Sequence, residues 1–216
     1  MFPENIKMQG MSGRVLSGKT RQLTIDKQHI NNVSWSWRPL ALLTGKVAFI
    51  WQVNDEQLLG QGIVSHSLLG LTQLSQVALN VNANELNSYL PKGNEVIGRI
   101  DLNIDSASFV EELKFISATA NMEPLTINTM IGKFKLDNLA LSANGSEKEG
   151  FKLHLTDTSA SENKVIAEIN QNKVTLSGLL KSQSKLASQL TPILPFIAKK
   201  QGENWLVSWQ GNIPRL

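Results

Sequence analysis

The chain has 216 residues, of which 41% are hydrophobic and 18% charged, with a formal net charge of +3 and no cysteine. A chain of this length is expected to form a single domain over residues 1–216. The lack of cysteine excludes disulfide bonds, cysteine-ligated zinc and thiol chemistry. Lysine and arginine are spread along the sequence, whereas nucleic-acid-binding proteins gather them on one face, so no nucleic-acid partner is expected.

Apolar and polar residues alternate along most of the chain, and this period of two is typical of β-strands with one buried face. The alternation starts at Leu23 and Ile25. It recurs in residues 33–37, 47–53, 77–81, 100–104, 134–141, 151–155, 174–176 and 205–209. About ten to thirteen strands are predicted. Hairpin turns are expected at Asn54 with Asp55, at Asn144 with Gly145, and at Gln171 with Asn172.

Two segments have the pattern of helices. Residues 84–90 would be capped by Asn84 and stopped by Pro91. Residues 179–200 carry an apolar stripe that Pro192 and Pro195 should break or kink. The stripe consists of Leu179, Leu186, Leu190, Leu194 and Ile197. We interpret this segment as a lid over an open end of the sheet, because its polar side lacks the many Lys and Arg residues of membrane-surface helices.

These elements predict a mainly β fold. The regular spacing of strands and turns favours an antiparallel arrangement. The fold class expected is a strongly curved sheet, an open barrel or a sandwich, with one short helix and one C-terminal helix.

Residues 13–20, Gly-Arg-Val-Leu-Ser-Gly-Lys-Thr, match the P-loop pattern G-x-x-x-x-G-K-[ST]. A working P-loop follows a buried strand and opens a helix whose N-terminus faces the phosphates. Here residues 21–26 alternate as a strand and no continuous apolar run precedes the pattern. We therefore expect no nucleotide partner and no cofactor. Gly13 and Gly18 should serve backbone turns, and Lys19 and Thr20 should be exposed strand residues.

Other catalytic or metal-binding patterns are missing from the sequence. The three histidines are isolated, without the spacing of a metal site. They are His29, His66 and His154. The acidic pairs at residues 55–56 and 111–112 would point to opposite faces of a strand, so neither pair forms a catalytic dyad. With no nucleophile, base and orienting group to combine, the chain is predicted not to be an enzyme.

The tryptophans are the most informative side chains. Trp35 and Trp37 are two residues apart and share one face of a strand, with Trp51 close by in the sequence. Trp205 and Trp209 lie near the C-terminus. We interpret these tryptophans as an aromatic layer of the core, and the alternative interpretation is an apolar groove or partner-binding surface.

Residues 33–45, Val-Ser-Trp-Ser-Trp-Arg-Pro-Leu-Ala-Leu-Leu-Thr-Gly, follow two Ser-Gly pairs at residues 12–13 and 17–18. This arrangement resembles the type II secretion system protein N family, whose pattern is Ser-Gly followed by a strand ending in W-x-x-x-P-L-A-L-L-x-G. Residues 86–91, 98–102 and 190–211 resemble the family more loosely. The family-motif residues, and candidate binding residues, are Gly13, Gly18, Trp35, Trp37, Pro39, Leu40 and Gly45.

The resemblance implies a non-enzymatic component of the bacterial type II secretion machinery. Family members look like a short cytoplasmic start, one inner-membrane helix and a periplasmic β domain, so this chain would be the periplasmic domain without its single-pass anchor. The implied role is assembly or scaffolding. The implied partners are other type II secretion proteins, on the inner-membrane platform or the secretin side. An alternative hypothesis is a periplasmic carrier whose curved sheet forms a groove for lipid or another apolar ligand.

Overall fold

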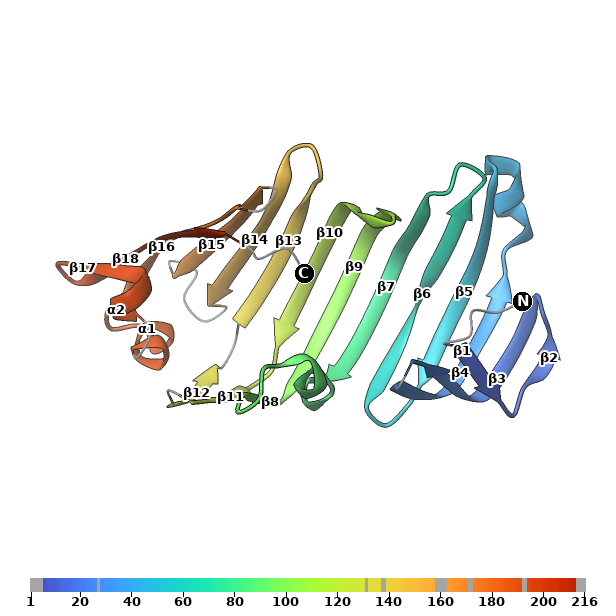
Figure 1. Cartoon of the computed structure of the whole chain (residues 1–216), viewed down its shortest axis with the longest axis horizontal. Helices are drawn as coiled ribbons and strands as arrows, with labels where there is room; N and C mark the ends of the chain where they lie inside the picture. Colours follow the sequence, from blue (N-terminus) through green and yellow to red (C-terminus); the bar gives the residue numbers. More distant parts are fainter. Residues whose placement is uncertain are drawn as a thin grey trace.

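The computed structural model describes residues 6–26, 28–130, 132–136, 139–157, 163–170, 173–191 and 194–212. Most of them belong to one 15-stranded antiparallel sheet, in the order β1-β3-β4-β5-β6-β7-β9-β10-β13-β14-β15-β16-β18-β17, with β2 paired to β3 (Figure 1). A separate three-stranded sheet has the order β12-β11-β8. The predicted antiparallel, strongly curved sheet is therefore confirmed. Its two end strands, β1 and β17, do not pair with each other in the described part of the chain.

The strands of the large sheet are β1 (Ile6–Gln9), β2 (Ser12–Arg14), β3 (Ser17–Ile25), β4 (Gln28–Trp37), β5 (Lys46–Asn54), β6 (Leu58–Ser67), β7 (Thr72–Asn82), β9 (Arg99–Val110), β10 (Glu112–Met122), β13 (Leu139–Ser146), β14 (Gly150–Asp157), β15 (Lys164–Asn170), β16 (Lys173–Lys181), β17 (Ala198–Gln201) and β18 (Asn204–Asn212). The small sheet consists of β8 (Glu95–Ile97), β11 (Leu125–Thr129) and β12 (Gly132–Leu136). The predicted number of strands was too low, because strands of three or four residues are too short to show alternation.

The turn predictions had mixed outcomes. Asn54 ends β5 and Asp55 begins the turn to β6, as predicted. Asn144 and Gly145 instead lie inside β13, so that prediction was wrong. A Cβ on Gly145 would lie 2.7 Å from the Cα of Phe151, so close packing accounts for this glycine without a turn. Gln171 and Asn172 fall outside the described residues.

The helices are shorter than predicted. Residues Ala83–Tyr89 form a 3-10 helix, η2, whose cap is Asn82 and not Asn84, with the Asn82 side chain accepting a hydrogen bond from the Asn84 backbone. The predicted helix 179–200 is helical only in α1 (Lys185–Leu190) and α2 (Leu194–Ile197). Its two ends belong to β16 and β17, because their backbones pair with β18. Pro195 lies in the first turn of α2, where proline is tolerated, and Pro192 falls outside the described residues.

Two small buried clusters hold extra elements against the sheet. In the first, Ala187 of α1 and Leu194 of α2 pack with Leu139, Leu180 and Val207 of the sheet. The lid interpretation is confirmed for Leu190, Leu194 and Ile197 of the predicted stripe. Leu179 is instead an exposed residue of β16, and the side chain of Leu186 is not described. The second cluster joins η2, β8 and β11 through Ala83, Val96 and Leu125.

The molecule has far more surface than a compact protein of its size. Its accessible surface is 14319 Å². A compact monomer of 23.8 kDa is expected to expose about 9,900 Å². More large apolar side chains are exposed than buried among the described residues. The long sheet is thus mainly a single layer, with one face left largely without a second layer. The described helices include none that is both long enough and apolar enough to span a bilayer.

Candidate functional site

One face of the large sheet is lined by three parallel rows of apolar residues and glycines, which we call the apolar face. Strand register defines each row. The first row is Trp37, Phe49, Val64, Leu74, Ala107, Ile116, Gly145, Phe151, Ile169, Val174 and Gly211. The middle row is Trp35, Trp51, Gly62, Val77, Ile104, Ala118, Ala143, Leu153, Ala167, Leu176 and Trp209. The third row is Val33, Val53, Gly60, Leu79, Leu102, Ala120, Leu141, Leu155, Val165, Gly178 and Val207.

No polar or charged residue interrupts these rows from β4 to β18. At about 4.8 Å between strands, each row is about 48 Å long. The three rows together are about 13 Å wide, since alternate residues of a strand are about 6.6 Å apart. An extra residue in each of β7 and β9 shifts the local register, and Gln76 has a φ of 52° at this point. These β-bulges keep the rows on one face through the middle of the sheet.

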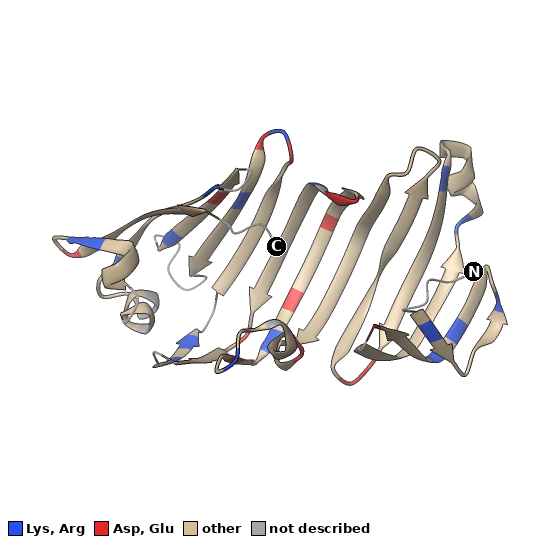
Figure 2. Ribbon diagram, in the orientation of Figure 1, with Lys and Arg blue, Asp and Glu red and all other residues tan. Residues whose placement is uncertain are grey.

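The opposite face is polar along its central row but also carries exposed apolar side chains, namely Ile50, Leu59, Phe115, Leu179 and Leu206. Its central row is Ser34, Gln52, Gln61, Ala78, Asn103, Thr119, Ser142, His154, Ile166, Ser177 and Ser208. An ion pair between Lys152 and Glu168, 3.1 Å long, lies on this face. Strands β6 and β7 carry no Lys, Arg, Asp or Glu, as the uncoloured strands of Figure 2 show. The sheet thus has one face whose three central rows are apolar throughout, and another on which polar residues are mixed with exposed apolar ones.

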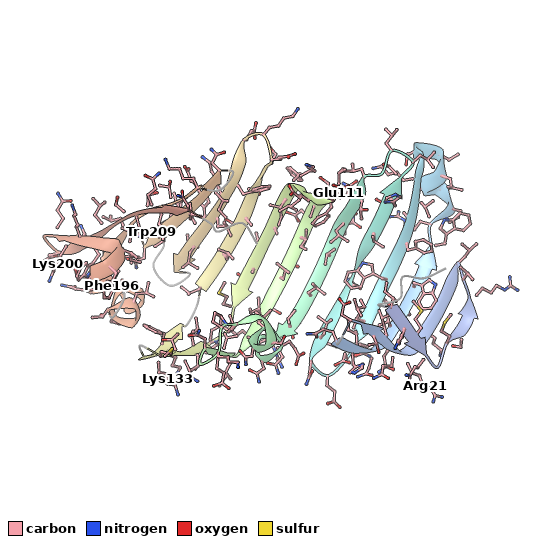
Figure 3. The ribbon with its side chains drawn as sticks, viewed as in Figure 1. Arg21, Glu111, Lys133, Phe196, Lys200 and Trp209 are labelled. Atoms are coloured by element: carbon pink, nitrogen blue, oxygen red, sulfur yellow. The ribbon has the colours of Figure 1, made fainter. Side chains whose placement is uncertain are left out.

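Three tryptophans of the apolar face lie against glycines. A Cβ on Gly18 would lie 2.8 Å from Cζ2 of Trp35, and one on Gly62 would lie 2.9 Å from Cζ2 of Trp51. Trp209, labelled in Figure 3, lies against Gly211 in the same way. The missing side chains let the indole rings lie close to the backbone. Sequence reasoning singled out Gly18 but missed Gly62 and Gly211, although a glycine inside an alternating strand signals a close approach.

Only part of the apolar face is covered. The cluster around α1 and α2 includes Leu155, Val165, Leu176 and Val207 of the rows. In the described part of the chain, neither buried cluster includes a row residue from β4 to β10. There, small side chains such as Val77 and Ala107 are buried beneath larger neighbours, whereas Trp35, Trp51 and Leu79 stay partly exposed. For Trp35 and Trp37, this arrangement favours the alternative interpretation, an apolar surface, over the aromatic core layer that the sequence suggested.

The P-loop pattern forms a β-hairpin. Gly13 pairs with Gly18 across β2 and β3, and no helix follows. Gly13 lies inside β2, with a φ of 101°, and Gly18 lies inside β3 beneath Trp35, so neither glycine makes the turn and both turn predictions were wrong. Lys19 is exposed as predicted. Thr20 is buried, so the prediction that it would be exposed was wrong, and its hydroxyl donates a hydrogen bond to the carbonyl oxygen of Gln9 at 2.7 Å.

The remaining motif residues form the connection between β4 and β5. Pro39 and Leu40 begin a 3-10 helix, η1 (Pro39–Thr44), which the alternation did not predict. Gly45 ends it in the left-handed region with a φ of 69°, a conformation that glycine adopts at no steric cost. Leu40 and Pro39 are exposed at the end of the strands, whereas Trp37 lies on the apolar face. The structure therefore separates the motif residues into a hairpin, an aromatic surface and an exposed loop.

Charged groups have structural roles near these elements. Asp55 is buried and accepts hydrogen bonds from the backbone N–H groups of Asn31, at 2.7 Å, and Gln57, at 3.0 Å. Burial alone would raise the pKa of Asp55, but the hydrogen bonds from Gln57 and Asn31 outweigh it and lower the pKa below 3.8. Among the described residues, no three His, Asp or Glu side chains are grouped to hold a metal ion. The chemistry available on the apolar face is burial of apolar surface.

Comparison with known protein families supports the resemblance that was inferred from the residues around Trp35. The family model described as "Type II secretion system (T2SS), protein N" matches residues 4–207, which is most of the chain. Among curated proteins and among solved structures, no significant match was found. The resemblance inferred from the motif at residues 33–45 is confirmed. The chain therefore belongs to the type II secretion system protein N family.

Proposed function

We propose that this chain is a non-enzymatic assembly component of the type II secretion machinery, which binds partner proteins at the periplasmic side of the bacterial inner membrane. The observation that carries the proposal is the uncovered apolar face between β4 and β10. Exposed apolar patches larger than a few hundred Å² mark interaction surfaces in soluble proteins. The expected partners are other secretion proteins, on the inner-membrane platform or the secretin side.

The extent of the sheet supports a binding role. The accessible surface exceeds that of a compact protein by about 4,400 Å². A standard protein–protein interface buries about 1,600 Å² in total, so the sheet has room for more than one partner. The three rows contain no titratable or nucleophilic side chain. Such a surface suits the binding of a partner and offers no group that could take part in a catalysed reaction.

Two neighbouring residues of β6 provide a matched test. Val64 lies on the apolar face and Ile63 on the opposite face, and both are partly buried β-branched residues. Secretion proteins identified by mass spectrometry should co-purify from cell-envelope extracts with the wild type and with Ile63→Gln, and be lost with Val64→Gln. Equal recovery with both variants would place the contact elsewhere. Normal secretion after deletion of the gene in an intact system would contradict an essential role.

A second candidate function is that of a carrier for lipid or another apolar ligand. It is favoured by the continuity of the rows, which run for about 48 Å across the strands without a polar residue. Acyl chains need such an unbroken apolar path. Native mass spectrometry after gentle purification should then find lipid bound to the wild type and to Ile63→Gln, but not to Val64→Gln. Consistent absence of lipid from the wild type would reject this function and leave the assembly role standing.

A further inference from the structure

Five leucines project from one end of strands β4 to β7, in two adjacent loops. We call this group the leucine tip. It consists of Leu40, Leu42 and Leu43 in η1, and Leu68 and Leu69 in the turn between β6 and β7. Their side chains are between 52 and 95% exposed. The two loops lie side by side, because the N–H of Leu68 donates to the carbonyl oxygen of Gly45 at 3.2 Å and Lys46 pairs with Ser67 (Figure 1).

The loops are held in place by their own hydrogen bonds. The N–H of Gly45 donates to the carbonyl of Leu42 at 2.9 Å, and the Thr44 hydroxyl donates to that of Ala41 at 2.9 Å. In the second loop, the N–H of Leu71 donates to Oγ of Ser67 at 3.1 Å. The leucines are therefore presented outward by ordered turns. Leaving them in water is unfavourable, since each buried CH₂ contributes about 0.8 kcal/mol.

The charge around the leucine tip suits an anionic surface. Residues 31–54 and 57–84 contain no Asp or Glu. Arg38 and Lys46 flank the η1 loop in the sequence. The nearest acidic side chains along the same edge are Glu111, between β9 and β10, and Glu112, the first residue of β10. A row of exposed leucines next to basic residues is the pattern of segments that enter a lipid interface.

The leucine tip is also continuous with the apolar face. Trp37 precedes η1 and begins the row that runs on through Phe49 and Val64. An open depression of about 460 Å³ lies between them, lined by Trp37, Arg38, Pro39, Leu40 and Ala41. A lipid in contact with the tip would thus meet the apolar face directly.

We propose that the leucine tip inserts into the boundary between head groups and acyl chains of an anionic phospholipid bilayer, and so holds this end of the sheet at the membrane surface. The leucines project from turns, with no walls around them, and a bilayer accepts such protruding side chains without a matching pocket. Arg38 and Lys46 would then lie at the level of the lipid phosphates. This proposal does not depend on the assembly role.

Vesicle flotation tests it. Vesicles of phosphatidylcholine with phosphatidylglycerol should bind the wild-type chain, and phosphatidylcholine alone should bind it several-fold less, because Arg38 and Lys46 attract anionic lipid. The double variant Leu43→Ser/Leu69→Ser should lower partitioning at least about tenfold. The matched control is Met130→Ser/Phe196→Ser, whose residues are similarly exposed; Met130 directly follows β11 and Phe196 belongs to α2, and both elements lie far from the tip (Figure 1). It should bind as the wild type does.

A second measurement detects insertion of the leucine tip directly, in variants that still bind the vesicles. The chain has no cysteine, so Leu69→Cys and Met130→Cys each create a unique site for an environment-sensitive dye. On adding the anionic vesicles, the emission of the dye at position 69 should shift to the blue, and that at position 130 should not. Failure of the wild type to float, equal loss in tip and control variants, or an unshifted dye at position 69 would each overturn the proposal.

Discussion

Replacing Gly62 with alanine tests whether Trp51 lies flat against β6. The new Cβ would lie 2.8 Å from Cγ2 of Val77 and 2.9 Å from Cζ2 of Trp51, well inside the carbon–carbon optimum of about 3.5–4.0 Å. Overpacking of this kind costs about 1–3 kcal/mol. Alanine restricts the unfolded chain more than glycine does, and this effect stabilises the folded state by about 0.4–1 kcal/mol. The net expectation is a loss of about 1–2 kcal/mol, or a decrease in Tm of about 2–8 °C for a chain of this length.

Thermal unfolding followed by far-ultraviolet circular dichroism measures this loss of stability. Making the same substitution in a Trp51→Phe variant identifies its cause. In Trp51→Phe the smaller ring vacates the position of Cζ2, so Gly62→Ala should cost at least about 0.5 kcal/mol less there than in the wild type. The residual cost would come from Val77. An identical cost in both backgrounds, or stabilisation by Gly62→Ala, would refute the close contact between ring and backbone.

Three further predictions concern the core, the acid response and the P-loop pattern. Leu194 of α2 is fully buried, so Leu194→Ala should cost about 2–5 kcal/mol by chemical denaturation, whereas Phe196→Ala on the same helix, at 80% exposure, should change stability by less than about 0.5 kcal/mol. Because the folded pKa of Asp55 is below its ordinary value of 3.8, its ionised form adds stability above that pH, and this stability is lost as the pH falls through the folded pKa. Asp55→Asn should therefore be less stable at neutral pH, and the gap to the wild type should narrow in acid; a constant gap would contradict the hydrogen-bonding role. Titration with Mg²⁺ and ATP should leave tryptophan fluorescence and Tm unchanged, and saturable binding that Lys19→Ala abolishes would overturn the hairpin interpretation.

Local patterns predicted the strands well where alternation was long. Val33, Trp35 and Trp37 share the apolar face because side chains alternate strictly along a strand. The same reasoning failed at Gly145 and at Gly18, which pack against Phe151 and Trp35 inside strands. A glycine that makes a turn and a glycine that makes room for a neighbouring strand look the same in one sequence, since the difference lies in a residue far along the chain.

The leucine tip could not be predicted for a related reason. Residues 39–43, Pro-Leu-Ala-Leu-Leu, form an unbroken apolar run, and such a run is normally buried. Its exposure follows from η1, which turns the chain outward at the end of β4, and its partner loop lies more than twenty residues later in the sequence. A backbone hydrogen bond between Leu68 and Gly45 brings the two together.

The sequence by itself determined the mainly β class, the alternating faces and the family, because each depends on residues close together in the chain. It also excluded thiol chemistry outright. Only the tertiary structure decided that the P-loop pattern is a hairpin of β2 and β3. It also decided that, among the residues it describes, the sheet stays open and six of its row-bearing strands, β4 to β10, are uncovered. Whether a sheet closes depends on the twist, bulges and register of many strand pairs together, so it cannot be predicted from any short stretch of sequence.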